Sequence, residues 1–308
     1  MRRKVNKIGP ATLMVSLPAK WVKSNEIEQG DEIDMEIEDS KLIIASTNDR
    51  SKRITKTLID LKNFKERAII NVIFQAYRKG FDEIKLQYHN PEQLKHVKQN
   101  SLKLLGFEVT ETTDKFCTIQ NIAEPSEDKF SVILKKMFFI IKEEGRTILE
   151  DVKENRFNLE DHKETKDNFD RYSNYVRRVI IKNKSGGDKD SYLLFFLCSQ
   201  LSYVEHSMFY MYQEYCKSKK KISEEVIKII EETNEMFNKL YDAFYLKKLD
   251  LANEIGLMKK ELIDGKVYEL LTTKKGVENI IVYHQAELIR LIHLASTVLF
   301  GLLEFEAE

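Results

Sequence analysis

The second half of the chain constrains the fold most, because its apolar residues recur with the period of a helix. Beyond Ser126, the residues Phe130, Ile133, Leu134 and Met137 stand three or four positions apart, and the pattern continues almost to the end of the sequence. This spacing places apolar side chains on one face of each helix. It predicts long amphipathic helices, joined by short links, that pack as an antiparallel bundle.

The helical half also has the pattern of a duplication. Residues 126–216 and 222–306 are similar in length, and each ends in an unusually apolar helix that follows two more amphipathic ones. We therefore expect two tandem three-helix units, each with one buried helix. Breaks between helices are expected near Asn158, at 183–191, at 217–223, near Asp264-Gly265 and at 272–276.

Two apolar stretches, residues 192–212 and 280–303, are long enough to be compared with membrane spans. Both contain ionisable side chains, which are costly at bilayer depth. We interpret both as buried helices of a soluble bundle and expect no membrane insertion. Their ionisable groups can be ligands or can satisfy one another between helices, and the second interpretation is favoured. They are Glu205, His206, His284, Glu287, Arg290 and His293.

The whole-chain composition points to no charged partner. The 308 residues include 50 Lys and Arg and 50 Asp and Glu, so any electrostatic preference must come from local clusters. Cys117, Cys198 and Cys216 show no C-x-x-C spacing, so neither a disulfide framework nor a zinc site is expected. The N-terminus lacks the apolar core of a signal peptide. These features indicate a cytoplasmic protein.

The first half of the sequence mixes strands and helices. Residues 1–48 alternate with period two and predict the order strand, strand, short helix, strand, strand, with one strand running to Leu17 and Pro18 starting the helix. Residues 53–122 predict a small α/β module, without a glycine motif that would bind phosphate groups. The predicted fold class is therefore α+β.

Residues 1–48 are too few to bury a core of their own. Segments of this size usually depend on disulfides, metals or a second chain, and the sequence offers neither of the first two. We therefore expect this segment to form a homodimer.

Charge changes sign abruptly inside the same segment. Residues 1–24 contain six basic residues and no acidic one, a net charge of +6, whereas residues 25–52 contain nine acidic and three basic residues, a net charge of −6. A charge run is often only a solvated face, and the acidic half is interpreted in that way. The basic half is expected to contact the phosphate groups of DNA.

The sequence "KIGPATLMVSLPAKWVKSNEIEQGDEIDMEIEDSKLIIA", within residues 3–46, resembles the SpoVT/AbrB/MazE family of swapped-hairpin DNA-binding domains. The shared features are the glycine before the second strand, Leu17-Pro18, the lysine-bearing short helix and Gly30-Asp31. The resemblance implies an intertwined homodimeric β-barrel that presents basic residues to DNA. Thr12 and Ser16 can reach phosphates or bases, or can pack across strands. The expected DNA contacts are Arg2, Arg3, Lys4, Lys7, Thr12, Ser16, Lys20 and Lys23.

The stretches "KDNFDRYSNYVRRVI" (166–180) and "LKKLDLANEIGLMKKELID" (246–264), with the apolar helices after them, resemble the PhoU family of phosphate-uptake regulators. This resemblance covers residues 126–306 and implies a tandem three-helix bundle. A barrel of the AbrB type joined to such a bundle is an arrangement of archaeal regulators.

The PhoU resemblance also raises the question of metal binding, because that family commonly holds metal ions with acidic pairs four residues apart. Asp167, Asp170 and Glu205 are the weak candidates here. Phe209 stands where a second acid would follow Glu205, and Thr297 stands at the corresponding place in the second unit. No metal and no other cofactor is therefore expected.

No catalytic motif is present, so the sequence does not predict an enzyme. The function predicted best is a DNA-binding transcriptional regulator linked to phosphate uptake, with the bundle as a sensing or relay domain. One alternative is a signalling adaptor that docks on a transporter or kinase and uses the barrel only to dimerise. A second alternative is an antitoxin-like regulator. The expected partners are DNA, a second copy of the chain and a protein of the phosphate-transport or signalling machinery.

Overall fold

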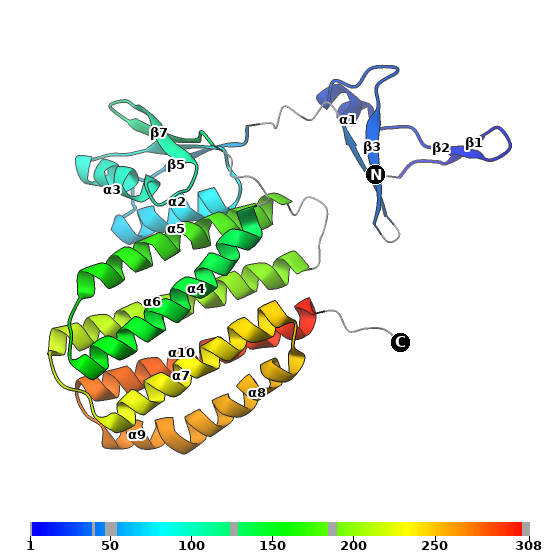
Figure 1. Ribbon diagram of the computed structural model, residues 1–308. Coiled ribbons are helices and arrows are strands. Elements are labelled where there is room, and N and C mark those ends of the chain that lie inside the picture. Colours follow the sequence, from blue (N-terminus) through cyan, green and yellow to red (C-terminus); the bar gives the residue numbers. More distant parts are fainter. Residues whose placement is uncertain (1, 39–40, 47–53, 124–128, 184–189, 304–308) are drawn as a thin grey trace. The chain divides into compact units, whose positions relative to one another are not determined.

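The structure is a computed structural model that describes residues 2–38, 41–46, 54–123, 129–183 and 190–303. The contacts divide the chain into two compact units, Met1–Thr55 and Lys56–Glu308. Short strands make up most of the first unit, and the second combines a small sheet with many helices (Figure 1). The predicted α+β class is confirmed.

The N-terminal unit has the predicted order of elements, arranged as two separate two-stranded antiparallel sheets with a short helix between them. Glycines with positive φ make two of its turns, Gly9 at 74° before β2 and Gly30 at 101° before β3. The elements are β1 (Asn6–Ile8), β2 (Thr12–Met14), α1 (Ala19–Ser24), β3 (Ile33–Glu38) and β4 (Lys41–Ser46).

The structure corrects the prediction around the proline. The strand β2 ends at Met14, so Ser16 and Leu17 lie in the connection to α1 rather than in a strand. Pro18 is the N-cap of α1, with φ −63° and ψ 122°, and not its first helical residue. The proline ring fixes φ at a value that suits both positions, so the sequence alone does not distinguish them.

The second unit begins with the predicted α/β module. Its four-stranded sheet has the order β5-β6-β8-β7, in which only β5 and β6 pair in parallel. The parallel pair is connected through α2, whose residues Ile69, Ile73 and Tyr77 are fully buried. The elements are β5 (Lys56–Asp60), α2 (Glu66–Arg78), β6 (Glu83–Gln87), α3 (Pro91–Ser101), β7 (Phe107–Thr112) and β8 (Phe116–Asn121).

The rest of this unit is helical, and α2 of the module packs against α5, as Figure 1 shows. One cluster of buried apolar side chains runs from Leu134 to Leu299. The division into two three-helix units at residues 216–222 stays a prediction. The helices are α4 (Phe130–Glu154), α5 (Leu159–Asn183), α6 (Asp190–Ser218), α7 (Glu224–Leu246), α8 (Leu249–Lys260), the π-helix η4 (Glu261–Val267), α9 (Tyr268–Thr273) and α10 (Val277–Leu302).

The break predicted near Asp264-Gly265 is wrong. The helical path continues through both residues as η4, and the chain leaves it only after Thr273. Leu262, Ile263 and Val267 are buried in this segment. Their packing holds the backbone in a helical path, although glycine lowers the intrinsic helix propensity.

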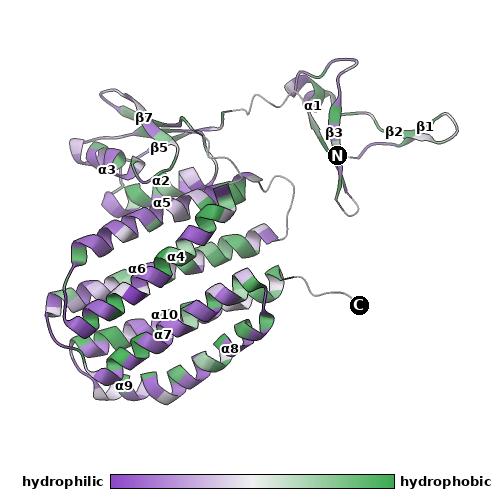
Figure 2. Ribbon diagram, viewed as in Figure 1, coloured by the Kyte–Doolittle hydropathy of each residue, from purple (hydrophilic) through white to green (hydrophobic). Residues whose placement is uncertain are grey.

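The two apolar stretches form α6 and α10, which pack against each other within the bundle. Within the described part of the chain, α10 alone is long and apolar enough to cross a membrane by length and composition. Half of its apolar window is buried against other helices. Hydrophobic and hydrophilic residues are interspersed along the helices in Figure 2, as expected for amphipathic helices.

Candidate functional site

The predicted DNA-contacting side chains are all exposed in the N-terminal unit. In the β1–β2 hairpin, Lys7 pairs with Leu13 and Thr12 pairs with Ile8. Directly paired residues share a face of the hairpin and neighbouring pairs alternate between faces. Lys7 and Thr12 therefore lie on opposite faces of the hairpin.

The lysines of the short helix lie together. Lys20 and Lys23 are three positions apart on α1, so they share one side of the helix, and both are exposed. Trp21 and Val22, between them on the same helix, are half-buried. The remaining basic residues, Arg2, Arg3 and Lys4, precede β1.

The hairpin formed by β3 and β4 has two chemically different faces. Cross-strand pairing places Met35 beside Ile44 and Ile37 beside Leu42 on one face, whereas Asp34 and Glu36 belong to the other. The apolar face is open, since Ile37 is 80% exposed and Met35 is 63% exposed. An uncovered apolar face of this kind marks an interaction surface.

This openness extends through the whole unit. Among its described residues no apolar side chain is buried, and Leu13 on the first hairpin is 70% exposed. Burial of apolar surface is the main favourable contribution to folding. A single copy of the N-terminal unit therefore has no core of its own, and its apolar faces stay uncovered within the unit.

The weak metal candidates of the bundle are engaged with basic side chains. Asp167 accepts a hydrogen bond from Lys103 Nζ at 2.6 Å. Asp170 accepts one from Lys166 Nζ at 2.7 Å and lies 2.8 Å from His206 Nε2. Across the residues that the structure describes, no group of three His, Cys, Asp or Glu side chains is placed to hold a metal ion.

Glu205 is different, because its carboxyl group is fully buried and neither oxygen has a hydrogen-bond partner. Its nearest basic group is His206 Nε2, at 3.7 Å. Burial, with the nearby charge of Asp170, raises the pKa of Glu205 well above its usual range. The neutral carboxylic acid is the form that this environment favours.

Two ionisable groups of α10, His284 and Glu287, contact α6. Ser207 Oγ on α6 donates to Glu287 Oε2 at 2.5 Å and lies 3.0 Å from His284 Nδ1. His293 Nδ1 is buried without a partner, and burial lowers the pKa of this imidazole. Arg290 is exposed.

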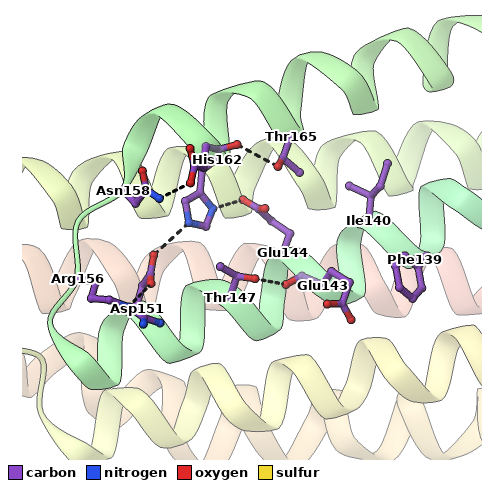
Figure 3. Close-up of a pocket in the computed structure, with 11 residues that line it drawn as sticks. Phe139, Ile140, Glu143, Glu144, Thr147, Asp151, Arg156, Asn158, His162 and Thr165 are labelled. Atoms are coloured by element: carbon purple, nitrogen blue, oxygen red, sulfur yellow. Dashed lines mark hydrogen bonds and ion pairs between the residues drawn. The ribbon is translucent and has the colours of Figure 1, made fainter.

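A cavity of about 520 Å³ lies between α4 and α5, near the turn that joins them. Asn155 makes that turn in the left-handed conformation, with φ 56°, and returns the chain so that the start of α5 faces α4. Figure 3 shows His162 pointing from α5 toward two carboxylates of α4. The lining residues are Phe139, Ile140, Glu143, Glu144, Thr147, Asp151, Arg156, Asn158, Asp161, His162 and Thr165.

His162 is the centre of a buried network of charges. Its Nδ1 lies 2.5 Å from Glu144 Oε1 and its Nε2 lies 3.3 Å from Asp151 Oδ2, and all three residues are buried. Asp151 also accepts hydrogen bonds from Tyr212 Oη at 2.5 Å and from Arg156 Nε at 2.9 Å. The network connects α4, α5 and α6.

The pKa values in this network move in the directions that favour charge. Burial alone disfavours the imidazolium, but Glu144 and Asp151 raise the pKa of His162 above its usual range. Burial also opposes ionisation of Asp151, yet Tyr212, His162 and Arg156 lower its pKa. The cavity therefore holds charges that satisfy one another, and its geometry supports a structural role.

The sequence carries a signal for this network that no catalytic or metal-binding motif includes. Glu144 and Asp151 are seven positions apart on α4 and continue the buried stripe formed by Met137, Ile141 and Ile148. Acidic residues at core positions of a helix need a buried partner. Arg156, after the end of α4, pairs with Asp151, and His162, early in the next helix, contacts both acids.

Comparison with known proteins concerns the N-terminal unit. The family model described as "Antidote-toxin recognition MazE, bacterial antitoxin" matches residues 7–52. This segment is similar to the MazE antitoxin family. The predicted resemblance is thereby confirmed for a segment that contains Lys7, Lys20 and Lys23 and the open apolar faces, whereas Arg2, Arg3 and Lys4 precede it. The resemblance of the helices to the PhoU family rests on the sequence motifs alone. Neither the curated proteins nor the solved structures that were compared with the chain gave a match.

Proposed function

We propose that the chain is a DNA-binding regulator that acts as a homodimer in the cytoplasm. The observation that carries the proposal is the N-terminal unit, in which six basic residues and none acidic precede a hairpin with an uncovered apolar face. The similarity of residues 7–52 to MazE supports the same interpretation. A second copy would cover the apolar faces, and each copy would contribute its basic residues to one DNA surface.

The helical part is proposed to relay a signal and not to catalyse a reaction. A ligand or partner of this part can regulate DNA binding only if it has different affinities for two arrangements of the dimer. The resemblance to PhoU is the reason to propose that the signal concerns phosphate supply, and a protein of the transport or signalling machinery is a candidate partner.

Salt-dependent DNA binding tests the proposal. Contact with phosphate groups releases counterions, so affinity for duplex DNA should fall steeply, by roughly 10³-fold or more between 50 and 200 mM salt if at least six phosphates are contacted. Changing Arg2, Arg3 and Lys4 to Ala should weaken binding. The slope of log K against log salt should then become shallower by about 0.9 for each phosphate that the variant no longer neutralises.

The matched control replaces three lysines elsewhere. Lys219, Lys220 and Lys221 are exposed between α6 and α7, and changing them to Ala removes the same charge. This variant should bind DNA as the wild type does. Equal losses of affinity in the two variants would indicate a nonspecific charge effect and contradict the proposal, as would the absence of binding at low salt.

The family description favours a second candidate, an antitoxin-like regulator. The open apolar faces of the hairpins would then be available to a toxin as well as to a second copy. Stable copurification of a small toxin with the full chain from its own cells, abolished when the apolar hairpin face is changed, would support this alternative.

A further inference from the structure

Two arginines lie where α2, α5 and α6 pack, and neither is paired with a carboxylate in the described part of the chain. Arg177 on α5 is 7% exposed, and it donates to the carbonyl oxygen of Cys198 at 3.3 Å and to Ser202 Oγ. Arg78 on α2 is half-buried, and its Nε donates to Asn174 Oδ1 at 2.8 Å. Neither guanidinium has an ion-pair partner among the residues that the structure describes.

The unsatisfied atoms at this contact are donors. Arg177 Nε and Asn174 Nδ2 are buried and make no hydrogen bond, and Asn174 is fully buried. The two residues are three positions apart on α5 and so share one side of the helix. Arg171, one turn earlier, has a buried Nε that also lacks a partner. Such a set of donors requires acceptors.

The pKa shifts of Arg78 and Arg177 indicate an excess of positive charge at this contact. Burial, together with the charge of Arg177, lowers the pKa of Arg78 to about 10. Burial likewise lowers the pKa of Arg177. Asp170 is the carboxylate that acts on both, but it already contacts Lys166 and His206. Its charge therefore offsets only part of the effect of burial on the two arginines, whose pKa values stay lowered.

We propose that Arg78, Asn174 and Arg177 form a binding site for a small oxyanion. A buried charge without a partner is strongly destabilising, so a bound anion explains why two unpaired guanidinium groups are placed together. The planar guanidinium matches two oxygens of a phosphate, sulfate or carboxylate group. An acceptor-only ligand also fits a site in which all the unsatisfied atoms are N–H groups.

The position of the site predicts that ligand binding affects the structure. Arg78 belongs to the α/β module, whereas Asn174 and Arg177 belong to the bundle, and Figure 1 shows α2 lying along α5. A bound oxyanion would link these two parts of the unit. The inference goes beyond DNA binding and does not depend on it.

Binding of inorganic phosphate to the full chain, without DNA, tests the site. Calorimetric titration at constant ionic strength, with chloride as the balancing anion, should show saturable binding of one phosphate per chain, and sulfate should compete. The melting temperature should rise by about 5 °C or more at a phosphate concentration near 100 times Kd. Arg177→Gln and Arg78→Gln should each weaken binding at least about tenfold.

Arg146→Gln is the matched control, because Arg146 is an exposed arginine of α4 that pairs with Glu143 and Glu150. It should leave phosphate binding unchanged. Without phosphate, Arg177→Gln should melt no lower than the wild type, since it removes an uncompensated charge. If Arg177→Gln fails to fold, the half-buried Arg78→Gln still provides the test. Absence of saturable binding to the wild type, or equal binding by a folded site variant, would overturn the proposal.

Discussion

Arg178 on α5 donates to Asp82 of the α/β module, with 2.6 Å between Nη2 and Oδ1. The guanidinium is 3% exposed, and its Nη1 also donates to the carbonyl oxygens of Tyr77 and Phe81 at 2.8 Å. It lies 4.8 Å from the ring centre of Phe107. One side chain thus donates to three acceptors of the module. The contact between the module and the bundle therefore includes specific hydrogen bonds in addition to apolar packing.

Changing Arg178 to Met should therefore destabilise the second unit strongly. Removal of the guanidinium leaves Asp82 with Lys182 as its remaining ion-pair partner and takes a donor from the two carbonyl groups, which should lower the free energy of unfolding by about 3 kcal/mol. Urea denaturation followed by circular dichroism measures it. The exposed variant Arg146→Met is the control and should be destabilised by less than about 1 kcal/mol. Equal midpoints for the two variants would show that the contact is not important for stability.

Changing Glu205 to Gln should stabilise the chain at neutral pH. The pKa of the carboxyl group is higher in the folded state than its value of 4.5 in the unfolded state. As the pH rises above 4.5, the unfolded state therefore ionises first, and the free energy of unfolding falls until the pH reaches the folded pKa. Gln does not ionise, so the gain should be absent near pH 4 and reach on the order of 1 kcal/mol or more at pH 7. Thermal melts across pH measure it.

The control for that experiment is Glu214→Gln, because Glu214 lies on the same helix and pairs with Lys217. Its stability should follow the wild-type pH profile. A Glu205→Gln variant that melts below the wild type at pH 7 would mean that the ionised carboxylate is needed, which is the opposite of the present interpretation.

His162 should contribute most to stability at mildly acidic pH. Its folded pKa is raised above the unfolded value of 6.5, so the stabilisation is complete below 6.5 and disappears as pH rises through the folded pKa. At acidic pH the network weakens for a second reason. Below 3.8, the pKa of Asp151 in the unfolded state, protonation of this carboxylate begins to remove its contribution. The difference in unfolding free energy between wild type and His162→Gln should be largest, about 2 kcal/mol, near pH 5 to 6.

Urea denaturation at several pH values measures this difference. His89→Gln removes one imidazole at a half-exposed position, where it contacts Asp60, and serves as the control. A difference between wild type and His162→Gln that grows from pH 6 to pH 9 would contradict the assignment of charge in the network.

Changing Gly145 to Ala should separate α4 from α7. A Cβ atom at this position would lie 2.5 Å from Asn234 Oδ1, and Asn234 Nδ2 donates to the Gly145 carbonyl oxygen at 2.8 Å. Despite the better helix propensity of Ala, we expect the free energy of unfolding to fall by about 1–3 kcal/mol. Gly265→Ala is the control, since nothing lies within 4 Å of its added Cβ, and it should be neutral or stabilising. Thermal melts that rank Gly145→Ala at or above Gly265→Ala would refute the packing argument.

Periodicity was sufficient to predict the order of the elements. The strands before residue 48, the α/β module and the long helices all follow from local spacing of apolar residues and from turn residues such as Gly30. Local sequence patterns did not predict the backbone conformation where tertiary packing determines it. The helical path through Gly265 is held by buried Leu262, Ile263 and Val267, which a propensity argument does not include.

The candidate sites were predictable to different degrees. The basic residues of the N-terminal unit could be named from the sequence alone. They lie close together along the chain, and their side chains are all exposed. His162 could be paired with Glu144 only by noticing acids within an apolar stripe. The hydrogen bond between Arg78 and Asn174 joins positions 96 residues apart, and nothing in the local sequence indicates that Arg78 and Arg177 act on one another.

The central claim is that the N-terminal unit becomes a DNA-binding surface only when a second copy covers its apolar face. Ile37→Lys tests it most directly, because Ile37 is 80% exposed in the single chain and a lysine there would cost a monomer less than about 0.5 kcal/mol. Leu257→Lys, at a 64% exposed position of α8, is the control.

Sedimentation of the full chain with and without duplex DNA is the deciding measurement. We predict that the wild type and Leu257→Lys sediment as dimers that bind DNA. Ile37→Lys should sediment as a monomer that does not bind DNA. A wild-type monomer that binds DNA, or an Ile37→Lys dimer with unchanged DNA affinity, would contradict the claim.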